Sequence, residues 1–422
     1  MSEPLSTDPY KGVRDFFPND WATMDALFAT MRNTLRAWGY EEYNASPLER
    51  AELYEAKTSE EIVSEQTYTF TDRGDRRVTL RPEMTPTLAR MVAAKRREIP
   101  FPLRWFSLPN VFRYERPQKG RLREHYQLNV DLIGVAGSEA DIETITLASE
   151  ILKAFGAKEN DFTIRINSRA LLTAACEATG LSVGSTRTYL HLLDKKAKME
   201  PEAFETARIA ITNTDPLALI NEAESSPKVA REKNALLETI EALSRRGVAN
   251  AVFDPTLTRG FDYYTGIVFE IFDTNPENTR SIFGGGRFDK LVTLFGGDTI
   301  PAIGFGMGDV TLADFLSTHG LTPKNNGDKP QLYLGTPTTS DIPTAQTFAA
   351  QLRESGARVF VNLSDRSLGD QIKDAVKREI PHFIAYGANE VAGQTIRMKT
   401  LATGEEITLP LSELAARLCA GN

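Results

Sequence analysis

The sequence predicts an α+β core with a mainly antiparallel sheet, a helical insertion within that core, and a small α/β domain at the C-terminal end. Strand-like runs and hairpin signals occur on both sides of residues 170–248. That stretch is rich in Ala, Leu, Glu and Lys and has no strand-like run, which indicates helices. After residue 330, apolar strand runs alternate with helical segments, as is typical of α/β domains with largely parallel strands.

The first part of the core is expected to begin with a helix and a hairpin. Apolar residues recur at three- and four-residue steps over residues 19–38, and Gly39 suits the helix end. Apolar and polar residues alternate on both sides of Asp72–Asp75, which predicts a hairpin over residues 67–85. Further strands are expected at residues 161–166, 250–253 and 266–272.

The run FRYERPQKGRLREHYQLNVDLIG, residues 112–134, predicts two strands joined by a basic loop. Between Arg113 and Glu124 there are five basic residues and two acidic ones. The strand that follows has a polar face and an apolar face: Gln127, Asn129 and Asp131 against Leu128, Val130 and Leu132. Arginine suits phosphate because its planar fork donates two parallel hydrogen bonds. The run therefore suits a ligand with both phosphate and amine or imidazole character, although a solvated, salt-bridged hairpin would carry the same charges.

The same patterns predict the domain boundaries. The core is expected over residues 1–169 and 249–320, with the insertion over 170–248 between them. Residues 321–330 are a linker, rich in Pro, Gly and Asn, and residues 331–422 form the C-terminal domain. Its expected order is strand, helix, strand, helix, strand, at residues 331–335, 342–354, 357–361, 367–379 and 382–387.

Composition argues against several classes of protein. The net charge of −8 over 422 residues disfavours nonspecific coating of nucleic acid, but it allows a local basic patch. Two cysteines are too few for a disulfide framework or a cysteine metal site, and the four histidines are well separated. No apolar run approaches the ~20 residues of a membrane-spanning helix. The N-terminus lacks the profile of a signal peptide, so we expect a cytoplasmic protein without membrane contact.

Three further segments carry candidate functional residues. In LRPEMTPTLAR (80–90), Glu83 and Thr85 follow a strand and share parity, so both could grip an ammonium group. Capping of a helix by Thr85 or Thr87 is the structural alternative.

In LTRGFDYYTGIVFEIF (257–272), Arg259 precedes a turn, and Tyr263 and Tyr264 precede a strand. Paired tyrosines also suit simple packing. The third segment combines FGGGRFDKLV (283–292) with PAIGFGMGDVTLADFL (301–316). Its glycines at 284–286, 304, 306 and 308 remove side chains where a backbone must approach something flat or bulky. A flexible loop and a tightly packed strand-to-helix joint would show the same glycines.

Taken together and in this order, these segments resemble the histidyl-tRNA synthetase family of class II aminoacyl-tRNA synthetases. YKGVRDFFP (10–18) is similar to the N-terminal signature, and the stretch around Pro47 to motif 1, which builds the dimer interface. FRYERPQKGRLREHYQ is similar to motif 2, LTRGFDYYTGIVFE to the histidine-specific segment, and GFGMGD to motif 3. The resemblance implies a six-stranded antiparallel sheet with the active site on its face, a homodimer, and a C-terminal anticodon-binding domain.

The resemblance also implies the reaction and its residues. Histidine would attack the α-phosphate of ATP, and the histidyl-adenylate would then acylate tRNA(His). The matching catalytic residues are Arg113 and Arg259, both at the α-phosphate. Glu83, Thr85 and Gln127 match the positions that hold the histidine amino group, and Asp131 and Tyr264, beside Tyr263, match those that read the imidazole. ATP would contact Arg113, Glu115, Arg121, Arg123 and Gly306, with Mg²⁺ on the outer phosphates. The tRNA acceptor end would meet Arg116, Gln118 and Lys119.

The chain departs from the family pattern in three places. Position 131 is Asp, where many bacterial members carry Glu. Motif 3 usually ends in Glu-Arg, but Val310 and Thr311 stand here, so the arginine that contacts ATP is missing. Arg121, Arg123 or Arg287 could replace it. Position 288 is Phe, where Tyr is common.

Two rival families remain on sequence grounds. The first is the synthetase-like regulatory subunit of ATP phosphoribosyltransferase, which has no aminoacylation activity. The missing motif 3 arginine favours this rival, and the retained Arg259, Tyr263–Tyr264 pair and C-terminal domain disfavour it. The second is a synthetase for proline, threonine or glycine, which the histidine-specific segment disfavours.

Overall fold

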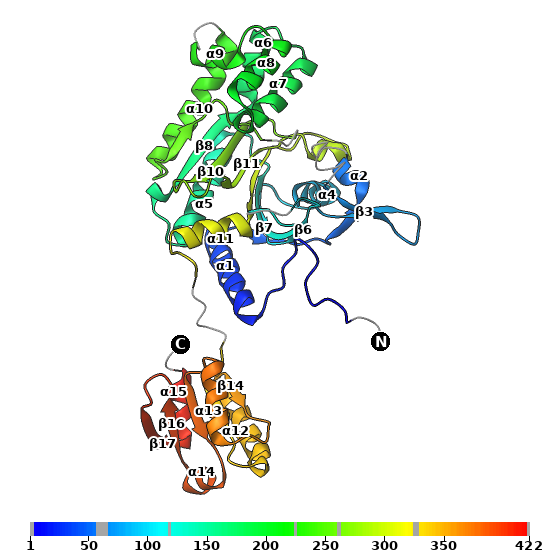
Figure 1. Ribbon diagram of the computed structural model, residues 1–422. Helices are drawn as coiled ribbons and strands as arrows, with labels where there is room; N and C mark the ends of the chain where they lie inside the picture. Colours follow the sequence, from blue (N-terminus) through cyan, green and yellow to red (C-terminus); the bar gives the residue numbers. More distant parts are fainter. Residues whose placement is uncertain are drawn as a thin grey trace. The chain divides into compact units, whose positions relative to one another are not determined.

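The computed structural model describes residues 4–55, 66–116, 120–222, 226–259, 263–323 and 329–419. The chain divides into two compact units, residues 1–323 and 324–422 (Figure 1). The first contains the main sheet and the helical insertion, and the second a smaller sheet with its own helices.

A nine-stranded sheet, counted over the described residues, forms the centre of the first unit. Its order is β1-β5-β7-β12-β11-β10-β8-β9, and β6 pairs with β7. The strands are β1 (Glu41–Glu42), β5 (Leu103–Ser107), β6 (Asn110–Phe112), β7 (Glu124–Ile133), β8 (Phe162–Ser168), β9 (Ala251–Phe253), β10 (Ile267–Asp273), β11 (Ser281–Arg287) and β12 (Ala302–Gly308). From β5 to β8 every pairing is antiparallel, and only the edge strands β1 and β9 pair in parallel. The expected antiparallel core is confirmed.

A separate three-stranded sheet contains the predicted hairpin. It consists of β2 (Leu48–Arg50), β4 (Arg77–Leu80) and β3 (Tyr68–Thr71), in the order β2-β4-β3. Asp72 closes the turn, because its Oδ1 accepts hydrogen bonds from the backbone N–H groups of Gly74 (2.8 Å) and Arg76 (3.0 Å). The hairpin expected around Asp72–Asp75 is therefore confirmed.

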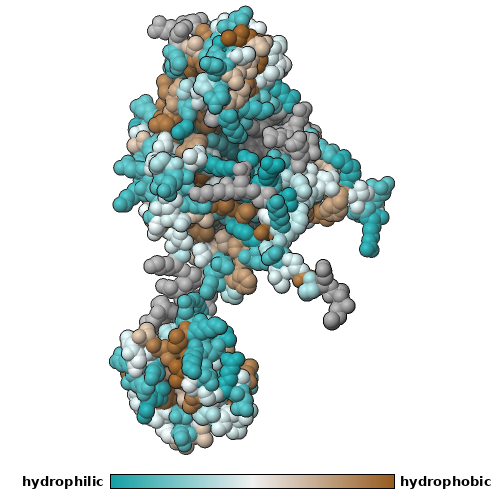
Figure 2. Space-filling view, viewed as in Figure 1, coloured by the Kyte–Doolittle hydropathy of each residue, from teal (hydrophilic) through white to brown (hydrophobic). Residues whose placement is uncertain are grey.

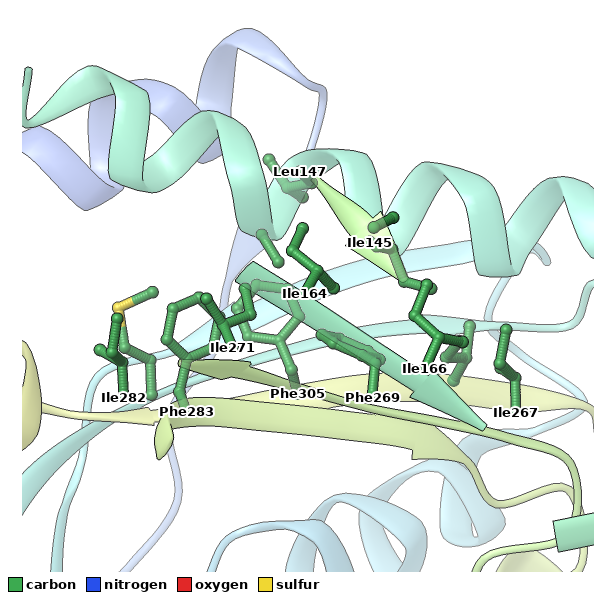
Figure 3. Close-up of a cluster of buried hydrophobic side chains, with 14 of the residues drawn as sticks. Ile145, Leu147, Ile164, Ile166, Ile267, Phe269, Ile271, Ile282, Phe283 and Phe305 are labelled. Atoms are coloured by element: carbon green, nitrogen blue, oxygen red, sulfur yellow. The ribbon is translucent and has the colours of Figure 1, made fainter. Parts of the chain in front are cut away.

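The two faces of the main sheet pack against different partners. Helices α1 (Pro18–Ala37) and α5 (Ser138–Ala154) contribute to the larger core, together with α11 (Asp309–Thr318). Figure 3 shows side chains of β8, β10, β11 and β12 pointing into this core, with Ile145 and Leu147 of α5 opposite them. Side chains alternate along a strand, so the intervening positions face the other side. There a smaller core includes α4 (Thr85–Lys95).

The region between β8 and β9 is helical, as expected. Its helices are α6 (Arg169–Ala178), α7 (Val183–Lys195), α8 (Pro201–Ile211), α9 (Pro216–Glu222) and α10 (Pro227–Arg245). Ser168 and Ser182 cap the first two, since their hydroxyls accept hydrogen bonds from Leu171 N (3.3 Å) and Ser185 N (3.2 Å). In Figure 1, α6 to α9 gather at one end of the unit, and α10 leads back to the sheet.

The first unit also has four shorter helical elements, α2 (Ala51–Glu55), η1 (Glu159–Asp161), η2 (Lys196–Lys198) and η3 (Val292–Phe295).

The second unit has a five-stranded mixed sheet. Its order is β14-β13-β15-β16-β17. The elements are β13 (Leu332–Gly335), η4 (Thr339–Asp341), α12 (Ile342–Glu354), β14 (Val359–Val361), α13 (Leu368–Lys377), β15 (His382–Ala385), α14 (Ala388–Gly393), β16 (Thr395–Thr400), β17 (Glu406–Pro410) and α15 (Leu411–Cys419).

The expectation of largely parallel strands in this unit holds only for its first half. β14, β13 and β15 are parallel, whereas β16 and β17 pair antiparallel. The connections before β16 and β17, residues 386–394 and 401–405, are too short for the crossover that parallel pairing needs.

On the face shown in Figure 2 hydrophilic residues predominate in both units. Among the described helices, none combines the length and apolar character required to traverse a membrane.

Candidate active site

Three adjoining cavities, together named the trough, lie in the first unit. The first, of about 160 Å³, shares Arg113 and Gln127 with the second, of about 180 Å³. The second shares Gly120, Ile282 and Thr311 with the third, of about 380 Å³. The shared residues show that the three cavities lie next to one another.

The first cavity brings together residues that lie far apart in the sequence. Its lining consists of Glu83, Thr85, Arg113, Gln127, Asn129, Asp131, Arg259, Tyr263, Tyr264, Gly284, Phe288, Gly304, Phe305 and Gly306. Every residue expected to contact histidine is in this set, as are the two arginines expected to be catalytic, Arg113 and Arg259. The polar face predicted for residues 127–131 is the face that lines the cavity, while Leu128 and Val130 belong to the larger core.

Glycines of β12 leave room for two of these side chains. Gly304 stands opposite Asp131 in the sheet, and a Cβ there would lie 3.0 Å from Asp131 Cγ and 2.5 Å from Val130 O. A Cβ on Gly306 would lie 2.7 Å from Gln127 Nε2. The expectation that these glycines admit something bulky is confirmed, and the bulky groups are the cavity's own polar side chains.

Two polar atoms of the cavity are buried without a hydrogen-bond partner in the described structure, Asp131 Oδ2 and Arg259 Nε. Burial raises the pKa of Asp131 well above its ordinary value. Arg259 is fixed through its other end, since Nη1 donates to Glu270 Oε1 over 3.0 Å. Unpartnered buried groups are uncommon in folded proteins, so the pair fits a ligand with a donor near Asp131 and an anionic group near Arg259.

Glu83 and Tyr263 meet across the cavity. The Tyr263 hydroxyl donates a hydrogen bond to Glu83 Oε2 over 3.0 Å. Burial, and next the charge of Glu83, raise the pKa of Tyr263, so the phenol remains neutral and able to donate. The rings of Tyr263 and Tyr264 lie 4.9 Å apart, which makes one aromatic wall beside the carboxylate.

The strand-like alternation assumed when Glu83 and Thr85 were said to share parity was wrong. Thr85 is the first residue of helix α4, and the preceding Met84 is the N-cap without a side-chain hydrogen bond. Capping by Thr87 is also excluded, because its hydroxyl pairs with the Tyr54 hydroxyl at 2.8 Å. Glu83 and Thr85 line the same cavity because the chain turns into the helix between them.

The second cavity joins the motif 2 segment to the start of helix α11. Arg113 stands at its junction with the first cavity and donates from Nε to Pro82 O over 2.8 Å. Glu115 pairs with Arg121 at 3.4 Å, and both line the cavity. His125 lines it too, and burial together with the charge of Arg113 lowers the pKa of His125 to about 3. The cavity therefore has a neutral imidazole beside fixed positive charge at neutral pH.

Comparison with known protein families agrees with this geometry. Residues 12–310 match the family model described as histidyl-tRNA synthetase, and residues 331–420 match the anticodon binding domain. The chain belongs to the histidyl-tRNA synthetase family. The family expected from the sequence is confirmed, and with it the enzyme class, histidine–tRNA ligase.

Relatives of this synthetase family match over nearly the whole chain. A histidine–tRNA ligase of Leptospira biflexa is 41% identical over 99% of this chain and 98% of its own length. One of Thermoplasma volcanium is 35% identical over 97% of this chain and 98% of its own length. The crystal structure of histidyl-tRNA synthetase from Nostoc sp. PCC 7120 has the same fold, with a TM-score of 0.78 at 24% identity, over 99% of this chain and 100% of that chain. These matches support a histidine–tRNA ligase better than they support the regulatory subunit of ATP phosphoribosyltransferase.

Not every residue expected at the synthetase site lines the trough. Arg123 Nη1 donates to the Tyr10 hydroxyl over 2.9 Å, and its guanidinium lies 4.1 Å from the Tyr114 ring centroid. Arg123 and the exposed Arg116 are absent from the lining of the three cavities. Gln118 and Lys119 lie outside the described residues. Gly306 lines the first cavity rather than the second.

Arg287 is not available to replace the missing motif 3 arginine. Its guanidinium is buried and pairs with Asp141 at 2.8 Å. It also donates to the carbonyl oxygens of Val135 and Gly137, both at 3.0 Å. These contacts tie β11 to the start of α5 and leave Arg287 outside the trough, so that suggestion was wrong.

Sequence reasoning missed two residues of this site, Glu270 and Arg280, and placed Asn129 on the polar face without giving it a role. Glu270, which fixes Arg259, is the single carboxylate in the apolar run IVFEIF, and that isolation was the available signal. Asn129 shares the polar face of β7 with Gln127, whose Nε2 donates to Asn129 Oδ1 over 2.7 Å. Arg280 lines the third cavity from the turn before β11, where the sequence has no distinguishing pattern.

Proposed function

We propose that this chain activates histidine with ATP in the first and second cavities and transfers it to tRNA(His). The carboxylate of histidine forms a bond to the α-phosphorus of ATP while the bond from that phosphorus to the bridging oxygen breaks, which releases pyrophosphate. A ribose hydroxyl at the 3′ end of the tRNA then attacks the carbonyl carbon of the adenylate. AMP leaves, and the histidyl ester remains on the tRNA.

The histidine side chain and amino group take opposite ends of the first cavity. Asp131 and Tyr264 face the two imidazole nitrogens, where a carboxyl group and a phenol accept and donate hydrogen bonds. Glu83, Thr85 and Gln127 hold the ammonium group, with Tyr263 orienting the Glu83 carboxylate through their 3.0 Å hydrogen bond. An amino acid without both ring nitrogens would leave buried polar groups unpaired, and the pocket would reject it.

Two arginines act at the α-phosphate. Arg113 lies where the first two cavities meet, and Arg259 lines the first. Phosphoryl chemistry requires mainly alignment of the reacting atoms and neutralisation of the charge that spreads over the phosphate oxygens. Arginines whose positions are already fixed, by Pro82 O and Glu270 respectively, supply that charge without reorganisation.

The outer phosphates of ATP carry Mg²⁺ in this proposal. Among the described residues there is no group of three or more His, Cys, Asp and Glu side chains placed to hold a metal ion. The chain's residues therefore fit a Mg²⁺ ion held chiefly by the phosphates, with one or two carboxylates added. The carboxylates that line the second and third cavities are Glu115, Glu277 and Asp314.

The remaining assignments concern partners. Arg116, Gln118 and Lys119 meet the tRNA acceptor end, where they would sense the extra 5′ guanosine of tRNA(His), and residues 331–422 read the anticodon. Two copies associate through the segment around Pro47, and the enzyme acts in the cytoplasm. The matches of residues 12–310 and 331–420 to a synthetase and an anticodon binding domain support the assignments to tRNA.

One observation carries the proposal: Asp131 and Arg259 line the same cavity, and Asp131 Oδ2 and Arg259 Nε are both buried there without a hydrogen-bond partner in the described structure. Its test is aminoacylation of a tRNA(His) transcript by the purified chain with labelled histidine and ATP. We expect histidyl-tRNA to accumulate, and far less of it on a transcript without the extra 5′ guanosine. Absence of histidyl-tRNA from a folded protein would instead favour the regulatory subunit.

A further inference from the structure

The tail of ATP needs positive charge beyond the α-phosphate. With that phosphate between Arg113 and Arg259, the second cavity, which shares Arg113 with the first, and the third cavity next to it offer room for the β- and γ-phosphates. The position that usually supplies the cation there is Thr311, whose hydroxyl donates to Ile282 O over 2.6 Å. Thr311 carries no charge, so a side-chain cation that contacts the tail beside Mg²⁺ has to come from another position.

The described lining of the second and third cavities contains three cations, Arg113, Arg121 and Arg280. Arg113 is already assigned to the α-phosphate. Arg121 forms an ion pair with Glu115 at 3.4 Å, which offsets its charge. Arg280 is exposed and lines the third cavity, and no described residue forms an ion pair with it. Arg280 is therefore the cation best placed to accept a new anionic partner.

Arg280 lies beside Thr311. A Cβ added to Gly120 would be 3.6 Å from Arg280 Cδ and Nη1, and 3.8 Å from Thr311 Cγ2. The two side chains thus flank one point at the boundary between the second and third cavities. Arg280 approaches this point from the turn before β11. An arginine at position 311 would approach the same region from helix α11.

The charges around this point also favour a cation. Glu277 and Asp314 line the third cavity with Arg280. Without Arg280 the described lining of that cavity would carry acidic groups alone, which would repel a polyphosphate. A guanidinium at the rim of such a cavity can bind two phosphate oxygens at once through its planar fork.

We infer that Arg280 binds the β- and γ-phosphates of ATP and takes the place of the missing motif 3 arginine. This inference rests on the proposed function, since it concerns the same ATP. Arg280 acts on ATP binding and on the position of the leaving pyrophosphate, and it has no contact with histidine.

The test compares Arg280→Ala with the wild type in histidine-dependent ATP–pyrophosphate exchange. Loss of a charge-assisted contact predicts a rise in the KM for ATP of about tenfold or more. The KM for histidine should stay within about twofold of the wild-type value, because the variant loses a contact with ATP and keeps every contact with histidine. Arg246→Ala, an exposed arginine after helix α10, is the matched control and should change neither value.

A second measurement separates the phosphate tail from the nucleoside. AMP as a competitive inhibitor should bind Arg280→Ala and wild type equally, since AMP has no β- or γ-phosphate. In the double variant Arg280→Ala, Thr311→Arg, a guanidinium returns to the same region, and the KM for ATP should recover most of the loss. If the KM for ATP of the double variant is as high as that of Arg280→Ala, the claim that arginines at positions 280 and 311 reach the same phosphates is contradicted.

The outcomes separate this inference from the proposed function. If wild type catalyses exchange and Arg280→Ala leaves the KM for ATP within twofold, the inference fails and the proposed function stands. Equal weakening of AMP and ATP would also overturn it, because Arg280 would then contact the nucleoside. Absence of exchange in the wild type would contradict the proposed function itself. Thermal unfolding of each variant verifies that it is folded.

Discussion

Arg259 Nη1 donates a hydrogen bond to Glu270 Oε1 over 3.0 Å, and both side chains lie over Gly284. Glu270 is the register partner of Gly284 in the β10–β11 pair. A Cβ on Gly284 would collide with the Arg259 guanidinium and would lie 2.9 Å from Glu270 Cγ. The carboxylate of Glu270 thus holds the partly buried Arg259 against the cavity, where Gly284 leaves room for it, and Arg259 Nε is buried with no hydrogen-bond partner in the described structure.

Replacing Arg259 should abolish adenylate formation. In Arg259→Ala the developing charge on the α-phosphate loses one of its two fixed cations, which predicts a fall in exchange rate of about 10²-fold or more. Glu270→Ala, which frees the arginine without removing it, should lower the rate less. Arg104→Ala removes an arginine paired with Glu143 at 2.7 Å outside the trough, and it serves as control. Near-normal exchange by folded Arg259→Ala would refute the role of Arg259.

Asp131 should determine the affinity for histidine. Asp131→Ala and Asp131→Asn each remove the carboxyl group that faces the imidazole, so the KM for histidine should rise about tenfold or more. The KM for ATP should change little, because the second and third cavities do not include this residue. Steady-state exchange at varied histidine and varied ATP measures both values. An unchanged KM for histidine would mean that Asp131 does not contact the substrate.

A single methyl group on Gly306 should weaken histidine binding without unfolding the protein. Its nearest neighbours would be side-chain atoms, Gln127 Nε2 at 2.7 Å and Cδ at 3.2 Å, so Gln127 must move. We expect a several-fold higher KM for histidine in Gly306→Ala and a nearly unchanged melting temperature. Gly184→Ala, where the nearest atom is Ser182 Oγ at 3.9 Å in helix α7, is the control and should keep the wild-type KM. Equal KM values in the two variants would contradict the close packing against Gln127.

The protonation of His125 should make stability depend on pH. Burial, and next the charge of Arg113, lower its pKa from 6.5 to about 3. The unfolded chain therefore binds a proton between these values that the folded chain does not. This contribution to stability is fully present above pH 6.5 and decreases as the pH falls toward 3, by up to about 1.4 kcal/mol per pH unit.

Urea unfolding at several pH values measures this effect as a difference between two proteins. His125→Gln lacks the titrating group, so its free energy of unfolding should fall less steeply than that of the wild type between pH 6.5 and 4. Comparing slopes removes the contributions of the acidic groups, which both proteins share. Parallel slopes would show that His125 has an ordinary pKa in the folded protein.

Local patterns predicted much of the fold and part of the site. The alternation in residues 127–132 separated the cavity face of β7 from its core face, because a strand's side chains alternate with a period of two. The helix expected over residues 342–354 is observed over Ile342–Glu354. These features depend on residues that are close together in the sequence, so they can be predicted from the pattern of one sequence.

Other features depend on contacts between distant segments, which local patterns do not record. Glu83 and Tyr263 are 180 positions apart and meet at 3.0 Å. The position of Arg280 beside Thr311 likewise depends on how a turn before β11 faces the start of α11. The family resemblance implied roles for Arg113 and Asp131, but it could not indicate Arg280, which lies outside the motifs.

Histidine-dependent ATP–pyrophosphate exchange by the purified full chain tests the central claim most directly. We predict that labelled pyrophosphate enters ATP when histidine is present, and that no other amino acid at the same concentration supports exchange at a comparable rate. A folded protein that gives no exchange with histidine, or equal exchange with another amino acid, would contradict the account.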